Sequence, residues 1–277
     1  MTFYMEIGEK INMDFKKSKG YDPIKLTEQT EKIVINGNKR KYANLARSLR
    51  FYGGIISATE VGCNLRCKFC FSDDPVRKPK VTGKFYTPKE VFNALSKSAK
   101  KNKCNLISAS ASEGTLGKEH LFELLEFVDK SDLIYVLETN GMTLGNDPEF
   151  SKELSRFKNL HVRVSIKGCT KDEYVKLTNA YPESYELPYK ALGYLIDNKV
   201  SCNACISVSF SNKDTISIAK EKLYNIRPGL LKSLEKEYIT LFPKVKNRLE
   251  KYGVLPNKIR QFGKIINYKM ENIGKIR

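Results

Sequence analysis

The segment GCNLRCKFC, residues 62–70, brings three cysteines, Cys63, Cys67 and Cys70, within eight residues of one another. A loop of this length can wrap around one metal cluster, and thiolates are soft ligands that suit iron. Three thiolates on a cubic four-iron cluster leave one iron without a protein ligand, whereas a cluster held by four cysteines is closed and typically only carries electrons. The spacing therefore indicates a cluster whose open iron can bind a small molecule and pass it an electron.

This spacing of three and then two residues, with Phe69 just before the last cysteine, resembles the radical S-adenosylmethionine (radical SAM) enzymes. The resemblance covers about residues 51–210. It implies a [4Fe-4S] cluster on Cys63, Cys67 and Cys70, whose open iron chelates the amino and carboxylate groups of S-adenosylmethionine. Electron transfer then cleaves S-adenosylmethionine to methionine and a 5′-deoxyadenosyl radical, which abstracts hydrogen from a substrate. A zinc site and buried structural thiols are the alternatives, but zinc usually takes four ligands in paired C-x2-C spacings.

Composition bounds the class of protein. At 277 residues the chain can bury a sizeable core, so we expect one α/β domain with extensions. No run of about 18 apolar residues is present, so we expect no membrane span. Residues 1–10 carry acids and no apolar segment, which is unlike a secretory signal. Seven cysteines do not suggest a disulfide framework in so long a chain, and an oxygen-sensitive cluster fits a reducing cytoplasm.

The net charge of +18 is concentrated at the two ends of the chain. Residues 1–50 carry +5, residues 51–226 only +4, and residues 227–277 carry +9. Basic flanks can hold a polyanion such as tRNA. The alternative is a lysine-rich genome bias that leaves lysines on solvated faces.

Strands and helices alternate at least five times between residues 51 and 226, which predicts parallel strands joined by crossover helices. Right-handed crossovers roll such a sheet into a barrel or partial barrel. This agrees with the partial (β/α)6 TIM-like barrel that the resemblance implies. We expect strands at residues 52–61, 104–110, 133–137, 160–166 and 206–210, and helices at 87–101, 119–130, 147–157, from 170, at 185–197 and at 214–224.

The flanks of this barrel are less regular. Residues 33–38 predict a short strand that ends in a turn, and residues 41–49 predict a short helix. Residues 228–252 predict one long helix, and a sixth strand is not evident. We therefore divide the chain into an N-terminal extension (1–50), the partial barrel (51–226) and a basic C-terminal extension (227–277).

Catalysis in such barrels takes place at the carboxyl ends of the strands, where the cysteine loop also lies. After the second strand, residues 107–116 stand where radical SAM enzymes carry Gly-Gly-Glu-Pro, which hydrogen-bonds the amino group of S-adenosylmethionine. Ala111 and Ser112 replace the two glycines and Glu113 stands at the glutamate position, so the resemblance implies contacts from Ser112 and Glu113. Ala111 lacks the conformational freedom of glycine, and a polar turn before a helix is the alternative.

The next two strand ends carry further candidates. By the same resemblance, Thr139 and Asn140 face S-adenosylmethionine, although Asn-Gly alone is a plain turn. Alternation along residues 161–167 puts Arg163, Ser165 and Lys167 on one side, which suggests a wet, functional barrel interior. The activating-enzyme branch of the family has a lysine here, which implies that Ser165 and Lys167 meet the ribose or carboxylate. The alternative places Lys167 in solvent.

Phe69 is implied to lie against the adenine, with a buried core position as its alternative. An auxiliary cluster is not expected from the remaining cysteines. Cys104 begins a strand and Cys169 follows the end of one, so they should lie at opposite ends of the barrel. Cys202 and Cys205 should lie on opposite faces of one strand. The two histidines, His120 and His161, have no ligand-spaced partner and favour structural or solvated roles.

Three functions remain in view. The first is modification of RNA, with the basic flanks holding phosphates. The second is activation or modification of a protein or peptide, as in the activating enzymes. Both need an external low-potential electron donor to reduce the cluster. The third is an iron–sulfur electron carrier or RNA-binding protein without S-adenosylmethionine chemistry, which the altered Gly-Gly-Glu segment favours.

Overall fold

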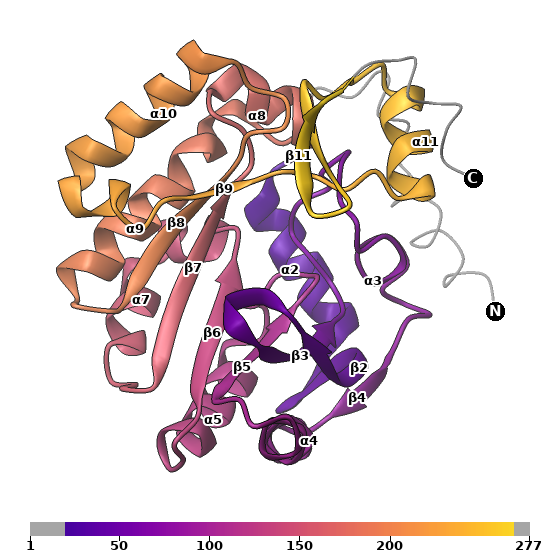
Figure 1. Cartoon of the computed structure of the whole chain (residues 1–277). Coiled ribbons are helices and arrows are strands. Elements are labelled where there is room, and N and C mark those ends of the chain that lie inside the picture. Colours follow the sequence, from indigo (N-terminus) through magenta and orange to yellow (C-terminus); the bar gives the residue numbers. More distant parts are fainter. Residues whose placement is uncertain (1–19, 269–277) are drawn as a thin grey trace.

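The computed structural model describes residues 20–268, which are organised around a curved sheet (Figure 1). At one edge of the sheet, β2 (Lys39–Leu49) pairs antiparallel with β3 (Ile55–Glu60), which is the first of the parallel strands. β2 also pairs with β1 (Ile35–Asn36) and β4 (Lys84–Tyr86). Within the described residues β9 does not pair with β2, so the sheet is open and forms a partial (β/α)6 barrel. The parallel strands are, in spatial order, β3 (Ile55–Glu60), β5 (Leu106–Ser110), β6 (Ile134–Thr139), β7 (Leu160–Ile166), β8 (Cys202–Ser207) and β9 (Glu235–Glu237).

Helices cover the outer face of this sheet (Figure 1). One example is α4, which begins at a capping box between Thr87 and Glu90 with proline at its first position, as the sequence predicts. No helix within residues 20–268 is both long enough and apolar enough to cross a membrane. The helices of the barrel are α4 (Pro88–Asn102), α5 (Lys118–Asp129), α6 (Met142–Asn146), α7 (Pro148–Leu154), α8 (Lys171–Thr178), α9 (Leu187–Asp197) and α10 (Lys213–Ile226).

Alternation along β7 separates an apolar face from a polar one. Val162, Val164 and Ile166 are fully buried in the core, and α9 packs against this strand. Arg163 and Ser165 point to the inner, concave side, where their side chains meet other polar groups. The predicted division of this strand into an apolar side and a polar side is confirmed.

Two predictions for the N-terminal flank need correction. The expected helix at residues 41–49 is wrong, because these residues belong to the long strand β2. Pairing with β3 and β4 supplies partners for the backbone of β2, and such tertiary pairing overrides the helical preference of its Ala, Leu and Arg residues. The strand expected at 33–38 is shorter, because α2 (Pro23–Val34) continues to Val34.

The C-terminal flank differs more. The long helix expected at residues 228–252 is wrong: a short 3-10 helix (Pro228–Leu231), β9 and α11 (Pro243–Lys251) occupy this stretch. Pro243 lacks the N–H that a helix interior needs and instead begins α11. The three residues of β9 form the sixth parallel strand, beside β8. The strand expected at 206–210 lies earlier, at 202–207. The boundaries of the extensions at 50 and 227 stay a prediction, although both flanks contribute strands to the same sheet.

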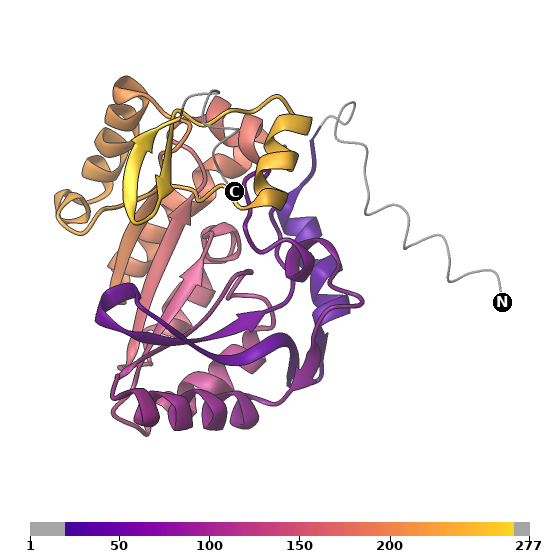
Figure 2. The ribbon, with the colours of Figure 1, turned by 45° about the vertical axis from the view of Figure 1, so that its right-hand side comes forward.

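The last described element is a hairpin of β10 (Lys258–Gln261) and β11 (Lys264–Asn267). The N–H groups of Asn257 and Lys258 donate to the carbonyl of Ser209 (2.6 and 3.0 Å), just beyond the carboxyl end of β8. Figure 2 shows the hairpin and α11 at the end of the molecule toward which the β6 and β7 arrows point. The C-terminal segment therefore lies at the end of the barrel where catalysis is expected.

His120 has a structural role: it lies in the first turn of α5 and joins this helix to the β1–β2 turn. Its side chain is buried, with Nε2 2.9 Å from the hydroxyl of Tyr42 and Nδ1 2.7 Å from the carbonyl of Asn38. A neutral ring that donates from Nδ1 and accepts at Nε2 satisfies both partners. Burial, aided by Arg40, lowers the pKa of His120 to about 4, although the hydrogen bond with the carbonyl of Asn38 opposes the fall.

This buried histidine makes folding stability depend on pH. The unfolded ring takes up a proton below its ordinary pKa of about 6.5, whereas the folded ring resists protonation until about pH 4. Stability is therefore full above pH 6.5 and falls as the pH drops toward 4, by about 2 kcal/mol between pH 7 and 5. Urea unfolding of wild type and His120→Gln at both pH values checks this. An equal loss of stability in the variant would contradict it.

Candidate active site

The cysteine loop, residues 62–70, leaves the carboxyl end of β3 through Gly62. Gly62 has φ of +95°, and a Cβ there would come within 2.8 Å of the side chain of Thr30 on α2. Both backbone conformation and packing therefore require glycine at this position. Its N–H donates to the carbonyl of Pro75 in α3 (Asp74–Arg77) at 2.9 Å, which ties the start of the loop to that helix.

The three thiols of this loop act on one another electrostatically. Burial, Glu113 and Cys67 raise the pKa of Cys63. Burial raises the pKa of Cys67 to about 11, with Lys167 opposing the rise and Cys70 adding to it. Within residues 20–268, however, no three His, Cys, Asp or Glu side chains converge on the site of a single metal ion. Each cysteine of a cubane binds a different iron, so a cubane does not require its three thiols to meet at one point, whereas a mononuclear zinc site does.

Donors around Cys63 fit the same interpretation. The N–H of Leu65 lies 3.4 Å from Cys63 Sγ, and Asn140 Nδ2 lies 3.7 Å from it. N–H groups directed at a ligating sulfur favour the thiolate and help to set the potential of an iron–sulfur cluster. Such donors at Cys63, the first of three closely spaced cysteines, suit a thiolate that binds an iron–sulfur cluster.

Glu113 organises the ends of β5 and β6. It is fully buried, and its Oε1 accepts from Thr115 Oγ1 (2.7 Å) and Thr139 Oγ1 (2.6 Å). Its Oε2 accepts from the N–H of Asn140 at 2.8 Å, and Asn140 in turn reaches Asn64 in the cysteine loop (2.7 Å). The structure therefore brings Glu113, Thr139, Asn140 and the loop together. Contact of these side chains with S-adenosylmethionine stays a prediction.

The backbone of the segment that carries Glu113 is held in place by Arg40, a residue that the sequence analysis did not single out. Arg40, on β2, is 1% exposed and forms an ion pair with the equally buried Glu60 (3.1 Å). It also donates to the carbonyls of Glu113 (2.6 Å), Gly114 (3.1 Å) and Leu116 (2.7 Å). No motif marks this arginine, because its partners are mostly backbone carbonyls.

The turn at the end of β5 is strained at Ala111, one of the two residues that stand where the family carries glycine. Ala111 has φ of +74°, in the left-handed region that glycine adopts without cost. The neighbouring Ser112 donates from Oγ to the carbonyl of Glu60 at 2.8 Å, which ties the turn to the end of β3. The hydroxyl of Ser112 thus stabilises the backbone of the turn.

Ser165 and Lys167 lie side by side at the end of β7. Lys167 Nζ donates to Ser165 Oγ (2.6 Å) and is 4.0 Å from Glu237 Oε2. Burial acts to lower the pKa of Lys167, but Glu237 and Cys67 raise it above its ordinary value. The ammonium therefore stays charged beside the cysteine loop rather than out in solvent.

The concave face next to these residues is lined by charges. Arg163 donates to Glu235 Oε2 (2.9 Å), lies 3.7 Å from Glu237 and donates to the thiol of Cys205 (2.8 Å). Burial raises the pKa of Glu138, on the adjacent strand, while Arg163 lowers it. Alternation predicted Arg163 here. The two glutamates of β9 were missed because that strand is only three residues long.

Phe69 lies in the core of this end of the barrel. It is 8% exposed, and its ring centroid is 5.5 Å from that of Phe210, which follows β8. This arrangement matches the buried alternative for Phe69. Contact with an adenine stays a prediction.

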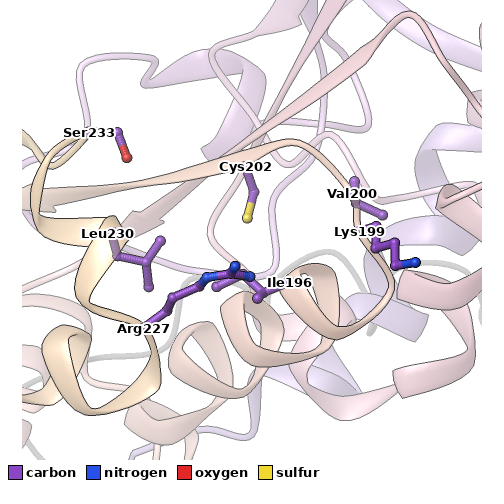
Figure 3. A pocket seen from close by; sticks show the side chains of 8 residues that line it. Ile196, Lys199, Val200, Cys202, Arg227, Leu230 and Ser233 are labelled. Carbon is purple, nitrogen blue, oxygen red and sulfur yellow. The ribbon is translucent and has the colours of Figure 1, made fainter.

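The four remaining cysteines lie in separate places. Cys104 precedes β5, Cys169 is buried after β7, and Cys205 meets Arg163 on the concave face. Cys202, at the amino end of β8, faces a hollow of about 360 Å³ beside Arg227 (Figure 3). That hollow lies at the opposite end of β8 from the cysteine loop.

The family model described as the Radical SAM superfamily matches residues 59–216, more than half of the chain. The chain therefore belongs to the radical SAM superfamily, whose enzymes use a [4Fe-4S] cluster and S-adenosylmethionine. A search of curated proteins found no match to the sequence.

Solved structures show the same fold at low sequence identity. SuiB of Streptococcus suis bound to precursor peptide SuiA is 15% identical, with a TM-score of 0.50 over 69% of this chain and 44% of SuiB. A cysteine-to-alanine mutant of spore photoproduct lyase with dinucleoside spore photoproduct is 12% identical, with a TM-score of 0.51 over 76% of this chain and 67% of the lyase. The chain thus spans less than half the length of SuiB.

Proposed function

We propose that the protein is a radical SAM enzyme in which Cys63, Cys67 and Cys70 hold a [4Fe-4S] cluster and the neighbouring strand ends hold S-adenosylmethionine. The observation that carries this is the grouping of three thiols with Asn140 and Lys167 at the carboxyl ends of parallel strands. When bound, the cluster and S-adenosylmethionine supply a 5′-deoxyadenosyl radical that abstracts hydrogen from a substrate.

The residues of the chain would act by holding and orienting. The Leu65 N–H and the Asn140 amide steady the Cys63 thiolate. Lys167, placed by Ser165, offers a fixed positive charge on the Cys67 side of the loop, which suits a carboxylate. Glu113 fixes the turns that carry Thr139 and Asn140 and thereby sets where these side chains can meet a ligand.

Anaerobic reconstitution with iron and sulfide, reduction with dithionite and detection of 5′-deoxyadenosine test this proposal. Transfer of deuterium from a labelled substrate into 5′-deoxyadenosine then identifies the hydrogen that is abstracted. A preparation that holds zinc, or a cluster with four protein ligands, would overturn the proposal in favour of a non-catalytic iron–sulfur or RNA-binding protein.

For the substrate we favour RNA, which the β10–β11 hairpin supports. Residues 258–267 contain Lys258, Arg260 and Lys264 and no acidic residue. Phe262, at the tip of the hairpin, is 93% exposed. Basic side chains beside an exposed aromatic ring are suited to phosphates and unpaired bases. A protein or peptide is the second candidate, and SuiB, which shares the fold, was solved with a peptide.

Either reaction would use a low-potential electron donor. We propose that the protein acts in the cytoplasm.

The hairpin gives a direct test of the RNA substrate. Phe262→Ala should weaken binding of single-stranded RNA by about 1–3 kcal/mol, because one stacked base is lost. Arg260→Gln should reduce the slope of log affinity against log salt by about 0.7, because one phosphate contact is lost. Fluorescence anisotropy across a salt series measures both quantities.

The matched control is Lys101→Gln, an exposed lysine near the end of α4, away from the hairpin. This variant should bind RNA as the wild type does. Salt-independent binding, or equal losses in all three variants, would exclude the hairpin as an RNA contact. Deuterium transfer from a labelled peptide would then favour the second candidate.

A further inference from the structure

Each of the three cysteines in the loop has its backbone carbonyl bonded to a guanidinium. Arg66 lies in the loop itself, Arg77 ends the nearby α3 and Arg248 comes from the distant α11; we call the three the arginine collar. The pairs are Arg66 with the carbonyl of Cys63 (2.5 Å), Arg77 with that of Cys67 (2.9 Å) and Arg248 with that of Cys70.

The collar is built into the packing of the site. Arg66 is 8% exposed, and the Arg248 side chain is 10% exposed. Arg248, on α11, also donates from Nε to the carbonyl of Lys68 (2.6 Å) and pairs with Asp73 Oδ1 (2.7 Å). Figure 1 places α11 beside α3, from whose last residue Arg77 reaches the loop. The guanidinium of Arg248 therefore joins the carbonyls of Lys68 and Cys70 to the carboxylate of Asp73.

We infer that the arginine collar is a positioning device for the cluster, and that Arg248 makes the C-terminal segment part of the redox centre. This rests on the proposed function, because it concerns the same three cysteines. Carbonyls held by these guanidinium groups restrict the backbone conformation of the loop, and thereby the directions in which its thiols can point. Arg248 lies outside residues 59–216, which the family model matches.

Charge gives the collar a second effect. A cluster carries one more negative charge after reduction, so nearby guanidinium groups stabilise the reduced state more than the oxidised state. Asp73 offsets part of this field, since it pairs with Arg248, Arg77 and Lys244. Three arginines and Lys167 stand against this shared carboxylate and Glu113, so cations still outnumber anions around the loop. The collar should therefore raise the reduction potential and ease the entry of the electron.

Arg248→Gln removes both the charge and the fork of donors, whereas Arg248→Lys keeps the charge alone. In the reconstituted protein, Arg248→Gln should lower the ratio of reduced to oxidised cluster at a fixed potential about tenfold, which is 59 mV for one electron. Arg248→Lys should restore most of that shift. Both variants should lose iron to a chelator several-fold faster than wild type, because the carbonyls of Lys68 and Cys70 are released. Redox titration monitored by electron paramagnetic resonance and chelator kinetics measure these effects.

Lys251→Gln is the matched control, because it removes one charge from the exposed end of the same helix. It should leave the potential and the iron loss as in wild type. If the wild type assembles a cluster and cleaves S-adenosylmethionine, but Arg248→Gln behaves as Lys251→Gln does, the collar is overturned and the proposed function stands. If the wild type assembles no cluster, the proposed function and the collar both fall.

Discussion

Replacing Cys67 by alanine should abolish the iron–sulfur cluster and reduce 5′-deoxyadenosine formation at least about 100-fold. The Cys67 thiol lies between the other two in the loop and next to Lys167, so its loss leaves two ligands for a cluster that needs three. The side chain is 7% exposed and small, so the apoprotein should lose only about 1 kcal/mol of stability. Iron content, visible absorption and product analysis after anaerobic reconstitution measure the effect, and circular dichroism measures the fold.

Cys104→Ala is the control for this experiment. Cys104 is also a free thiol, partly buried where Cys67 is buried, but it precedes β5 and lies outside the cysteine loop. This variant should reconstitute as the wild type does. A Cys67→Ala protein that keeps a full cluster would mean that other side chains hold the iron, and the site would have to be sought elsewhere.

The sequence predicts the cluster end of this molecule well because its signals are local. The three cysteines lie within one loop, the turns carrying Glu113 and Asn140 directly follow strands, and the alternation of Arg163, Ser165 and Lys167 needs only one strand. Each of these features depends on neighbours a few residues away, so pattern and structure agree on where the residues lie.

Features built from distant residues leave no such pattern. β9 is three residues long and exists as a strand because β8 lies beside it, so its glutamates could not be assigned to the barrel interior. Arg248 reaches the backbone of a loop 178 residues earlier in the chain, and a carbonyl partner imposes no sequence motif. Glu113 was expected to face S-adenosylmethionine, yet both of its oxygens accept bonds from the chain itself, which only the folded turns reveal.

Arg40→Met should lower the free energy of unfolding by about 3–5 kcal/mol. The substitution removes the partner of Glu60. Burial already raises the pKa of Glu60 to about 7 although Arg40 opposes the rise, so without Arg40 the buried carboxyl must either stay charged and unpaired or take up a proton, and breaking such a pair from one side is strongly destabilising. It also leaves the carbonyls of Glu113, Gly114 and Leu116 without their donor. Urea unfolding at neutral pH measures the loss.

A double-mutant cycle separates these two causes. Adding Glu60→Gln to Arg40→Met replaces the unpaired acid by a neutral amide, so the double variant should be more stable than Arg40→Met alone by about 1–3 kcal/mol. The remaining difference in free energy of unfolding between the double variant and wild type then reflects the unpaired carbonyls of the 113–116 turn. Lys152→Met, which breaks an exposed ion pair with Glu149, is the control and should unfold close to the wild-type midpoint. If Glu60→Gln instead destabilises Arg40→Met further, the carboxylate has other partners and the buried pair does not hold this turn in place.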